Sequence, residues 1–199
     1  MAAAGAAAGF AAMPARAFVP SFAGLPSAAS GLKPALLGRA LGALQRHAGS
    51  VANHGTIGIV DFSAHSSSPR FHLVDVESGR TTSLLVAHGR GSDPDRTGFV
   101  QHFSNADGSN ASSMGAYLTG DIYDGKHGRS RRLFGLDSSN SNVERRSIVV
   151  HSAWYVGPEV LRANGQLGRS EGCFAVSPSD LALVLDRLGP GHMIYADKA

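Results

Sequence analysis

The sequence predicts a mainly β domain with a few helices, a fold of the α+β class. From residue 56 onward, short β-branched segments alternate with glycine, serine and proline, which is the pattern of strands joined by tight turns. Three other segments carry the apolar spacing or the terminal residues of helices. The chain has 199 residues, a length that favours one domain, with or without an appendage.

Residues 1–17 resemble a secretory signal peptide. They are apolar and small, and they end in Ala15-Arg16-Ala17, which is similar to an A-x-A cleavage site. The apolar run is too short to span a bilayer comfortably, so we expect no stable membrane span. The pattern predicts an exported protein, with a low-complexity alanine tail as the alternative.

Residues 18–49 are expected to form a linker and then one helix. The first part is rich in proline, serine and alanine, as linkers are. In the second part, Pro34 suits a first helical turn and Gly49 suits the C-terminal cap. We expect the apolar face of this helix to pack on the main domain, residues 50–199. That face consists of Leu36, Leu37, Ala40, Leu41 and Leu44.

Seven strands and two further helices are expected within residues 50–199. In the last helix, Ser177 suits the N-cap and Pro178 the first helical position. On the strand after Arg145, alternation favours Trp154 in the core and Tyr155 beside a cleft. The strands are expected at residues 56–62, 70–76, 81–88, 115–123, 131–136, 146–156 and 192–196, and the helices at 157–165 and 177–189.

Charge and cysteine content narrow the function classes. The net charge is only +3, and no basic run exceeds pairs such as Arg131-Arg132 and Arg145-Arg146, so no nucleic-acid partner is expected. The single cysteine, Cys173, excludes an internal disulfide. In an exported protein a lone thiol indicates reactivity or intermolecular pairing, and the alternative is a buried inert residue.

We expect no metal and no cofactor. A zinc site needs three or four converging ligands, and the nine histidines show no such spacing. His88, which ends an expected strand, is interpreted as a satisfied polar residue. A meeting of His127 with His151 in space would leave a metal hydrolase as a minor alternative.

The stretch HSAWYVGPEVLRANGQLGRSEGCF runs from His151 to Phe174 and pairs a histidine with the cysteine. A histidine within hydrogen-bond reach can take the thiol proton. Gly172 lets the backbone approach a substrate closely, and N–H groups around Cys173 can stabilise an oxyanion. These residues predict a Cys–His site, although nine histidines make a chance pairing common.

The segments VVHSAWYV and GRSEGCFAVSPSDL closely resemble the catalytic signature of the YkuD-like L,D-transpeptidases. That signature is a histidine followed by Gly or Ser and, a couple of dozen residues later, Ser/Thr-x-Gly-Cys. The wider run from LVAHGR to LFGLD resembles a bacterial subgroup of murein L,D-transpeptidase catalytic domains. The match covers roughly residues 56–195. The resemblance implies an L,D-transpeptidase-like β-sandwich or barrel.

The resemblance also implies residue roles. Cys173 would be the nucleophile, and His151 the general base and later the acid. Ser152 would orient the imidazole, while Ser170 and Gly172 would shape the cysteine loop. The candidates for substrate binding are Arg169, Tyr123, Lys126 and His127.

The implied reaction joins peptidoglycan peptide stems. A thioacyl enzyme forms on a tetrapeptide stem with release of terminal D-alanine, and the amine of a second stem then makes a 3→3 cross-link. Attack by water would make an L,D-carboxypeptidase, and a non-catalytic wall-binding module is the third reading. Ala175 and Phe174 depart from the family pattern of Asn or Arg and of Pro. We therefore look to Arg169 first for a stem carboxylate.

Overall fold

The computed structural model describes residues 31–199, so the signal-like segment and nearly all of the expected linker lie outside the described residues. The described chain contains eight strands in one mixed sheet and three α-helices, which confirms the predicted α+β class. Among the described helices, none has the length and apolarity needed to cross a bilayer. The elements are α1 (Pro34–Arg46), β1 (Thr56–Asp61), β2 (Phe71–Asp75), β3 (Thr81–Leu84), β4 (Gly115–Gly125), β5 (Gly128–Gly135), β6 (Val149–Ser152), α2 (Pro158–Asn164), β7 (Phe174–Val176), α3 (Leu181–Arg187) and β8 (Met193–Asp197), with short 3₁₀ turns at Arg90–Ser92 and Ser138–Asn140.

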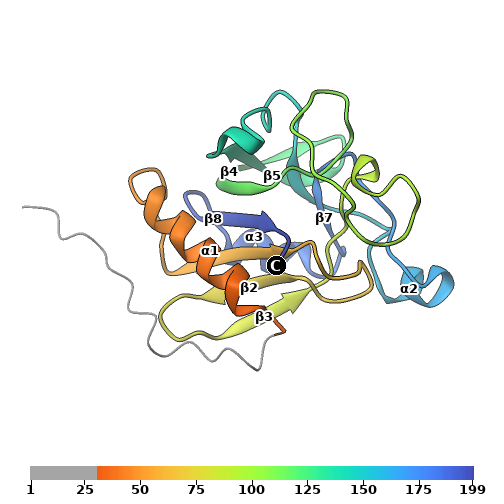
Figure 1. Ribbon diagram of the computed structural model, residues 1–199, viewed down its shortest axis with the longest axis horizontal. Helices are drawn as coiled ribbons and strands as arrows, with labels where there is room; N and C mark the ends of the chain where they lie inside the picture. Colours follow the sequence, from red (N-terminus) through yellow and green to blue (C-terminus); the bar gives the residue numbers. More distant parts are fainter. Residues whose placement is uncertain (1–30) are drawn as a thin grey trace, which may run out of the picture.

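The strand order in the sheet is β3-β2-β1-β8-β4-β5-β6-β7. Neighbouring strands are antiparallel except for β1 with β8 and β6 with β7, which are parallel. The last strand in sequence therefore lies in the middle of the sheet, between β1 and β4 (Figure 1).

The sheet curls until its two ends meet. The Ala87 N–H, just beyond β3, donates to the Ala175 carbonyl of β7 at 2.9 Å. Inside the curl, Phe62 from the β1 end stacks on Phe174 of β7, with ring centroids 6.2 Å apart. Both belong to one core cluster that draws side chains from both ends of the sheet. This closure brings the segment after β3 against the segment that carries Cys173.

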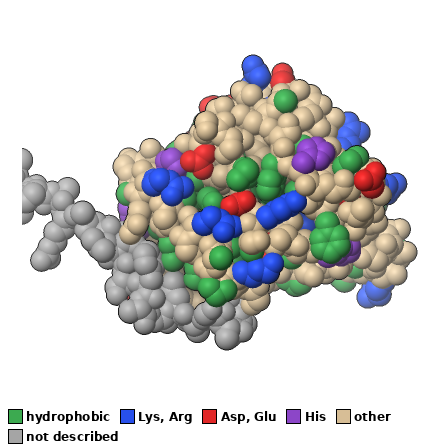
Figure 2. All heavy atoms as spheres, viewed as in Figure 1, with side chains coloured by type: hydrophobic (Ala, Val, Ile, Leu, Met, Phe, Trp, Pro, Cys, Tyr) green, Lys and Arg blue, Asp and Glu red, His purple; other side chains and the backbone are tan. Residues whose placement is uncertain are grey.

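Helix α1 covers the outer face of the sheet. Leu36, Ala40 and Leu44 are buried in a second cluster with side chains of β1, β2, β4 and β8. Two ion pairs join the first half of the helix to the sheet. Lys33 Nζ lies 3.9 Å from Asp61 Oδ2, and Arg39 Nε lies 3.0 Å from Asp197 Oδ2. Figure 2 shows charged side chains of both signs interspersed on this face.

Two helix ends differ from the prediction. Helix α1 ends at Arg46 with His47 as its cap, rather than at Gly49. The Nε2 atom of His47 lies 2.9 Å from Asp137 Oδ1, and this contact fixes the end of the helix. Helix α3 begins at Leu181 with Asp180 as its N-cap, so it starts later than predicted and Ser177 does not hold the N-cap position. The Ser177 hydroxyl nevertheless makes capping-box-like contacts in the turn before the helix: it donates to the Asp180 carboxylate at 2.7 Å and accepts the Asp180 N–H at 3.2 Å.

The strand around His151 is also shorter than predicted, and this changes the aromatic residues that follow. Strand β6 ends at Ser152, and the chain then turns. Alternation no longer applies there, so the core placement predicted for Trp154 is wrong: its side chain is 83% exposed. Tyr155 does lie beside a cleft, as expected.

Candidate active site

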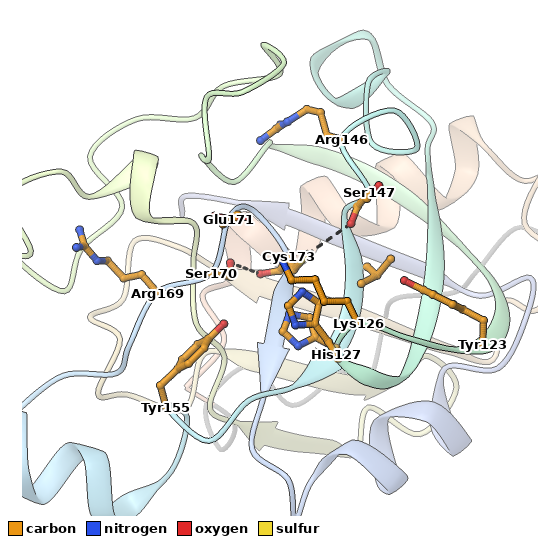
Figure 3. Close-up of a pocket in the computed structure, with 12 residues that line it drawn as sticks. Tyr123, Lys126, His127, Arg146, Ser147, Tyr155, Arg169, Ser170, Glu171 and Cys173 are labelled. Atoms are coloured by element: carbon orange, nitrogen blue, oxygen red, sulfur yellow. Dashed lines mark hydrogen bonds between the residues drawn. The ribbon is translucent and has the colours of Figure 1, made fainter.

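A cavity of about 610 Å³ opens beside the start of β7. It brings Cys173 and His151 together with the four side chains expected to bind substrate (Figure 3). The cavity is lined by Tyr123, Lys126, His127, Arg146, Ser147, Val149, His151, Tyr155, Arg169, Ser170, Glu171 and Cys173.

Adjacent strands position the histidine and the cysteine. In the parallel pair of β6 and β7, His151 lies opposite Ala175, two residues beyond Cys173. On the other side, His151 lies opposite Ser130 of β5. The hairpin that joins β4 to β5 turns through Lys126 and His127. This register places the hairpin turn over His151.

The Ser-x-Gly-Cys sequence forms a tight loop. The Ser170 hydroxyl donates to the Cys173 carbonyl at 2.7 Å and accepts the Gly172 N–H at 3.1 Å. Gly172 has φ +118°, and a Cβ there would lie 2.7 Å from the Ala111 carbonyl oxygen. A side chain at this position is therefore excluded by both conformation and space. The loop itself therefore needs a hydroxyl group at position 170 and glycine at position 172.

The thiol of Cys173 is largely buried. The residue is 8% exposed, and Sγ lies 3.6 Å from the Ser147 carbonyl. Burial raises the pKa of Cys173, and the carboxylate of Glu171 adds to this effect. A hydrogen bond from the Val149 backbone and the positive charge of Arg146 oppose the increase in pKa. The resting thiol is thus kept protonated.

The imidazole of His151 is fixed by its neighbour. Its Nδ1 lies 2.8 Å from the Ser152 main-chain carbonyl oxygen. Because a carbonyl oxygen can only accept a hydrogen bond, Nδ1 must carry the proton of the neutral ring, and Nε2 is left free to act as the base. Burial lowers the pKa of His151, the charge of His127 lowers it further, and the Ser152 hydrogen bond opposes both. The expected orienting role of Ser152 would thus use its carbonyl group.

The Cys173 thiol and the His151 imidazole line the same cavity without a direct hydrogen bond. The thiol donates to the Ser147 carbonyl rather than to His151. His127 stacks on the His151 ring, with centroids 4.3 Å apart. Among residues 31–199, no three His, Cys, Asp or Glu side chains converge as metal ligands.

The residues expected to bind substrate differ in their placement. Tyr123 is covered by the Arg132 guanidinium, 4.3 Å from the ring centroid, and its hydroxyl points toward the cavity in Figure 3. Lys126 and His127 are exposed on the hairpin. Arg169 lines the cavity, but its guanidinium donates to the Asp93 carbonyl and is drawn turned away from Cys173 (Figure 3).

Sequence reasoning missed several lining residues. Arg146 appears in the sequence only as half of a basic pair, yet it reaches the cavity while bonding Ser104, Ala111 and Ser113. Glu171, inside the cysteine motif, pairs with Arg90 at 3.0 Å. The position of Arg146, three residues before β6, was the available signal.

Comparisons with known proteins agree with this picture. The sequence profile described as the L,D-transpeptidase catalytic domain matches residues 28–196. No curated protein sequence matches the chain significantly.

Solved structures show weaker likeness. An L,D-transpeptidase from Mycobacterium smegmatis is 15% identical, with 72% of this chain and 58% of that chain covered and a TM-score of 0.43. An L,D-transpeptidase from Xylanimonas cellulosilytica is 16% identical, with 73% of this chain and 62% of that chain covered and a TM-score of 0.43. The helical cell shape determining protein Pgp2 from Campylobacter jejuni is 10% identical, with 74% of this chain and 48% of that chain covered and a TM-score of 0.48. The chain thus spans less than two thirds of the length of these proteins. Because the profile covers most of its residues, the chain belongs to the L,D-transpeptidase catalytic domain family.

Proposed function

We propose that this protein is a cysteine-dependent L,D-transpeptidase that acts on peptidoglycan tetrapeptide stems. The observation that carries the proposal is one cavity lined both by the only cysteine and by a buried histidine whose Nδ1 is fixed by the Ser152 carbonyl. The family of the chain supports the same chemistry. An extracytoplasmic substrate also agrees with the proposed export of the protein to the periplasm or cell wall.

The first step acylates the thiol. The raised pKa of Cys173 and the lowered pKa of His151 leave both groups neutral at rest. The thiol therefore passes its proton to His151 Nε2 as Sγ attacks the carbonyl carbon of the third stem residue. Because Ser170 already binds the Gly172 N–H, the neighbouring Cys173 N–H is the loop donor for the oxyanion. His151 then protonates the amine of D-alanine, which leaves.

The second step transfers the acyl group. The side-chain amine of another stem attacks the thioester carbonyl, loses its proton to His151 Nε2 and forms the 3→3 amide bond. The proton returns to sulfur as the C–S bond breaks. If water attacks instead, the product is a tripeptide and the protein is an L,D-carboxypeptidase, with the same residues in the same roles.

The test is product analysis with purified disaccharide-tetrapeptide, followed by mass spectrometry, for the wild type and for Cys173→Ala. Cysteine-dependent dimers that have lost one alanine support the transpeptidase. Cysteine-dependent tripeptide alone supports the carboxypeptidase. Equal product from Cys173→Ala contradicts the mechanism, and absence of product together with binding to isolated wall material favours a non-catalytic module.

A further inference from the structure

A buried polar cluster lies behind the cysteine loop. It consists of the side chains of Arg70, His88 and Asp93, each at most 1% exposed. None of the three lines the active-site cavity, so the proposed chemistry does not use them directly. Buried charged groups destabilise a fold unless they are paired, which raises the question of what this cluster holds in place.

The contacts fix the state of each member. Arg70 Nη2 lies 2.7 Å from His88 Nδ1, and a guanidinium only donates. His88 Nδ1 must therefore accept, and the neutral ring carries its proton on Nε2. That nitrogen lies 3.4 Å from Asp93 Oδ2, a contact too long and poorly aligned for a strong hydrogen bond, so we treat it as electrostatic. Neutral His88 thus separates a buried cation from a buried anion.

Both charged ends are anchored. Arg70 donates from Nε and Nη2 to the Val86 carbonyl at 3.1 and 3.0 Å. The Asp93 carboxylate accepts the Thr97 N–H at 2.7 Å and the Gly98 N–H at 2.9 Å. Ring, guanidinium and carboxylate therefore lock the main chain from residue 86 to residue 93 into one conformation.

This locked main chain holds the cysteine loop. The His88 carbonyl accepts the Ser170 N–H at 2.9 Å, and the Arg90 N–H donates to the Ser170 carbonyl at 2.8 Å. The Asp93 carbonyl accepts from the Arg169 guanidinium. The Ser170 hydroxyl in turn bonds the Cys173 carbonyl at 2.7 Å. Hydrogen bonds therefore link the backbone of the cluster residues to the backbone of Cys173.

We propose that His88, held between Arg70 and Asp93, is a positioning residue for the nucleophile: it fixes the main chain on which Ser170, and through it Cys173, is seated. Its catalytic consequence rests on the proposed function, but its effect on the loop does not. Displacement of an active-site atom by about 1 Å can lower the rate of a reaction about a hundredfold. A less rigid Cys173 loop should therefore lower the rate of catalysis.

The test compares His88→Asn with His72→Asn. Asparagine at position 88 can still accept from Arg70 but is too short to reach Asp93. His72 is a matched control because it is 2% exposed and bonds Ser83 Oγ through Nδ1 at 2.8 Å, outside the cavity-lining set. Alkylation by iodoacetamide reports the loop, since Cys173 is the only cysteine. Turnover of tetrapeptide reports catalysis.

We expect His88→Asn to alkylate at least about threefold faster while kcat for transpeptidation falls about tenfold or more. His72→Asn, matched for thermal unfolding, should change neither rate. Ser170→Ala already removes the hydrogen bond between the Ser170 hydroxyl and the Cys173 carbonyl. Adding His88→Asn to that variant should therefore change the alkylation rate little. Equal effects of the two histidine variants, additive effects with Ser170→Ala, or a wild-type alkylation rate in His88→Asn would overturn the proposal.

Two further measurements cover failure of a variant or of the proposed function. If His88→Asn does not fold, His88→Gln is measured instead. Its longer side chain reaches toward Asp93 but leaves Arg70 without the acceptor that His88 Nδ1 provides, so faster alkylation and a lower kcat are again expected. In the wild type, amide exchange of Ser170 should be slow, and fast exchange contradicts the proposal. Absence of wild-type turnover would refute the proposed function, while the alkylation rates would still decide the role of His88.

Discussion

The imidazole of His127 lies face to face with that of His151, with ring centroids 4.3 Å apart and an interplanar angle of 19°. The two rings come from different elements, the β4–β5 hairpin turn and strand β6. The exposed His127 thus covers the buried base and adds repulsion to any positive charge on it. The hairpin turn is therefore part of the electrostatic environment of the proposed catalytic base.

Replacing His127 with alanine should raise the pKa of His151. The substitution removes the repulsive charge and opens the ring to water, and both changes favour the protonated imidazole. The acid limb of kcat/KM should then move to higher pH, and NMR titration of the His151 ring protons should show the same shift. His127→Phe, which keeps the stack without the charge, should shift the limb less. Identical profiles for both variants and the wild type would contradict a role for the stack.

Wild-type activity should be constant over an unusually wide pH range. His151 must be neutral to accept the thiol proton, and its pKa is lowered, so the acid limb should lie below the usual value of about 6.5. The pKa of Cys173 is raised, so the alkaline limb should lie above about 8.5. Steady-state kinetics across pH measures both limbs. An acid limb at or above the usual histidine value would contradict the lowered pKa of His151.

The folded protein should lose stability in mild acid because of His88. Burial and the charge of Arg70 lower the pKa of His88 from 6.5 to about 4. Below pH 6.5 His88 binds a proton in the unfolded chain, whereas in the folded chain it stays neutral down to about pH 4. The free energy of unfolding should therefore decrease as the pH falls through that range. Urea midpoints at about pH 7 and about pH 5 test this. His88→Asn should show a smaller difference between the two midpoints.

Trp154→Ala should leave stability nearly unchanged. A side chain that is 83% exposed contributes little packing, so the change in unfolding free energy should stay within about 0.5 kcal/mol. A buried tryptophan would cost about 3–5 kcal/mol. Denaturant unfolding of the variant distinguishes these values. A loss above about 2 kcal/mol would show that the indole packs on the domain after all.

The fold class and most strands were predictable because they follow from local patterns. Short β-branched segments bounded by glycine, serine and proline mark β1, β2 and β4, and Pro34 marks the start of α1. Helix and strand ends were less predictable, since tertiary contacts decide them. The His47–Asp137 contact at the end of α1 joins residues 90 positions apart. Likewise, nothing local announces that β6 stops at Ser152 and exposes Trp154.

The candidate site was partly predictable for a similar reason. The Cys173 loop and the His151 strand are compact motifs that can be read from neighbouring residues. Arg146 and the cluster around His88 depend on long-range closure of the sheet. That closure is visible in the bond between Ala87 and Ala175, which lie far apart in sequence. The spacing of residues in the sequence does not reveal this closure, so Arg146 and the cluster around His88 were interpreted as ordinary charged or polar residues.

The central place of β8 has a consequence for how the protein folds. Strand β8 pairs with both β1 and β4, so the ladder between the two halves of the sheet is complete only when the last strand has paired. Pairings between segments so distant in sequence slow folding. Until the domain has folded, the thiol of Cys173, which is only 8% exposed in the folded protein, is open to oxidants. In an oxidising compartment, folding of this domain therefore competes with oxidation of its only cysteine.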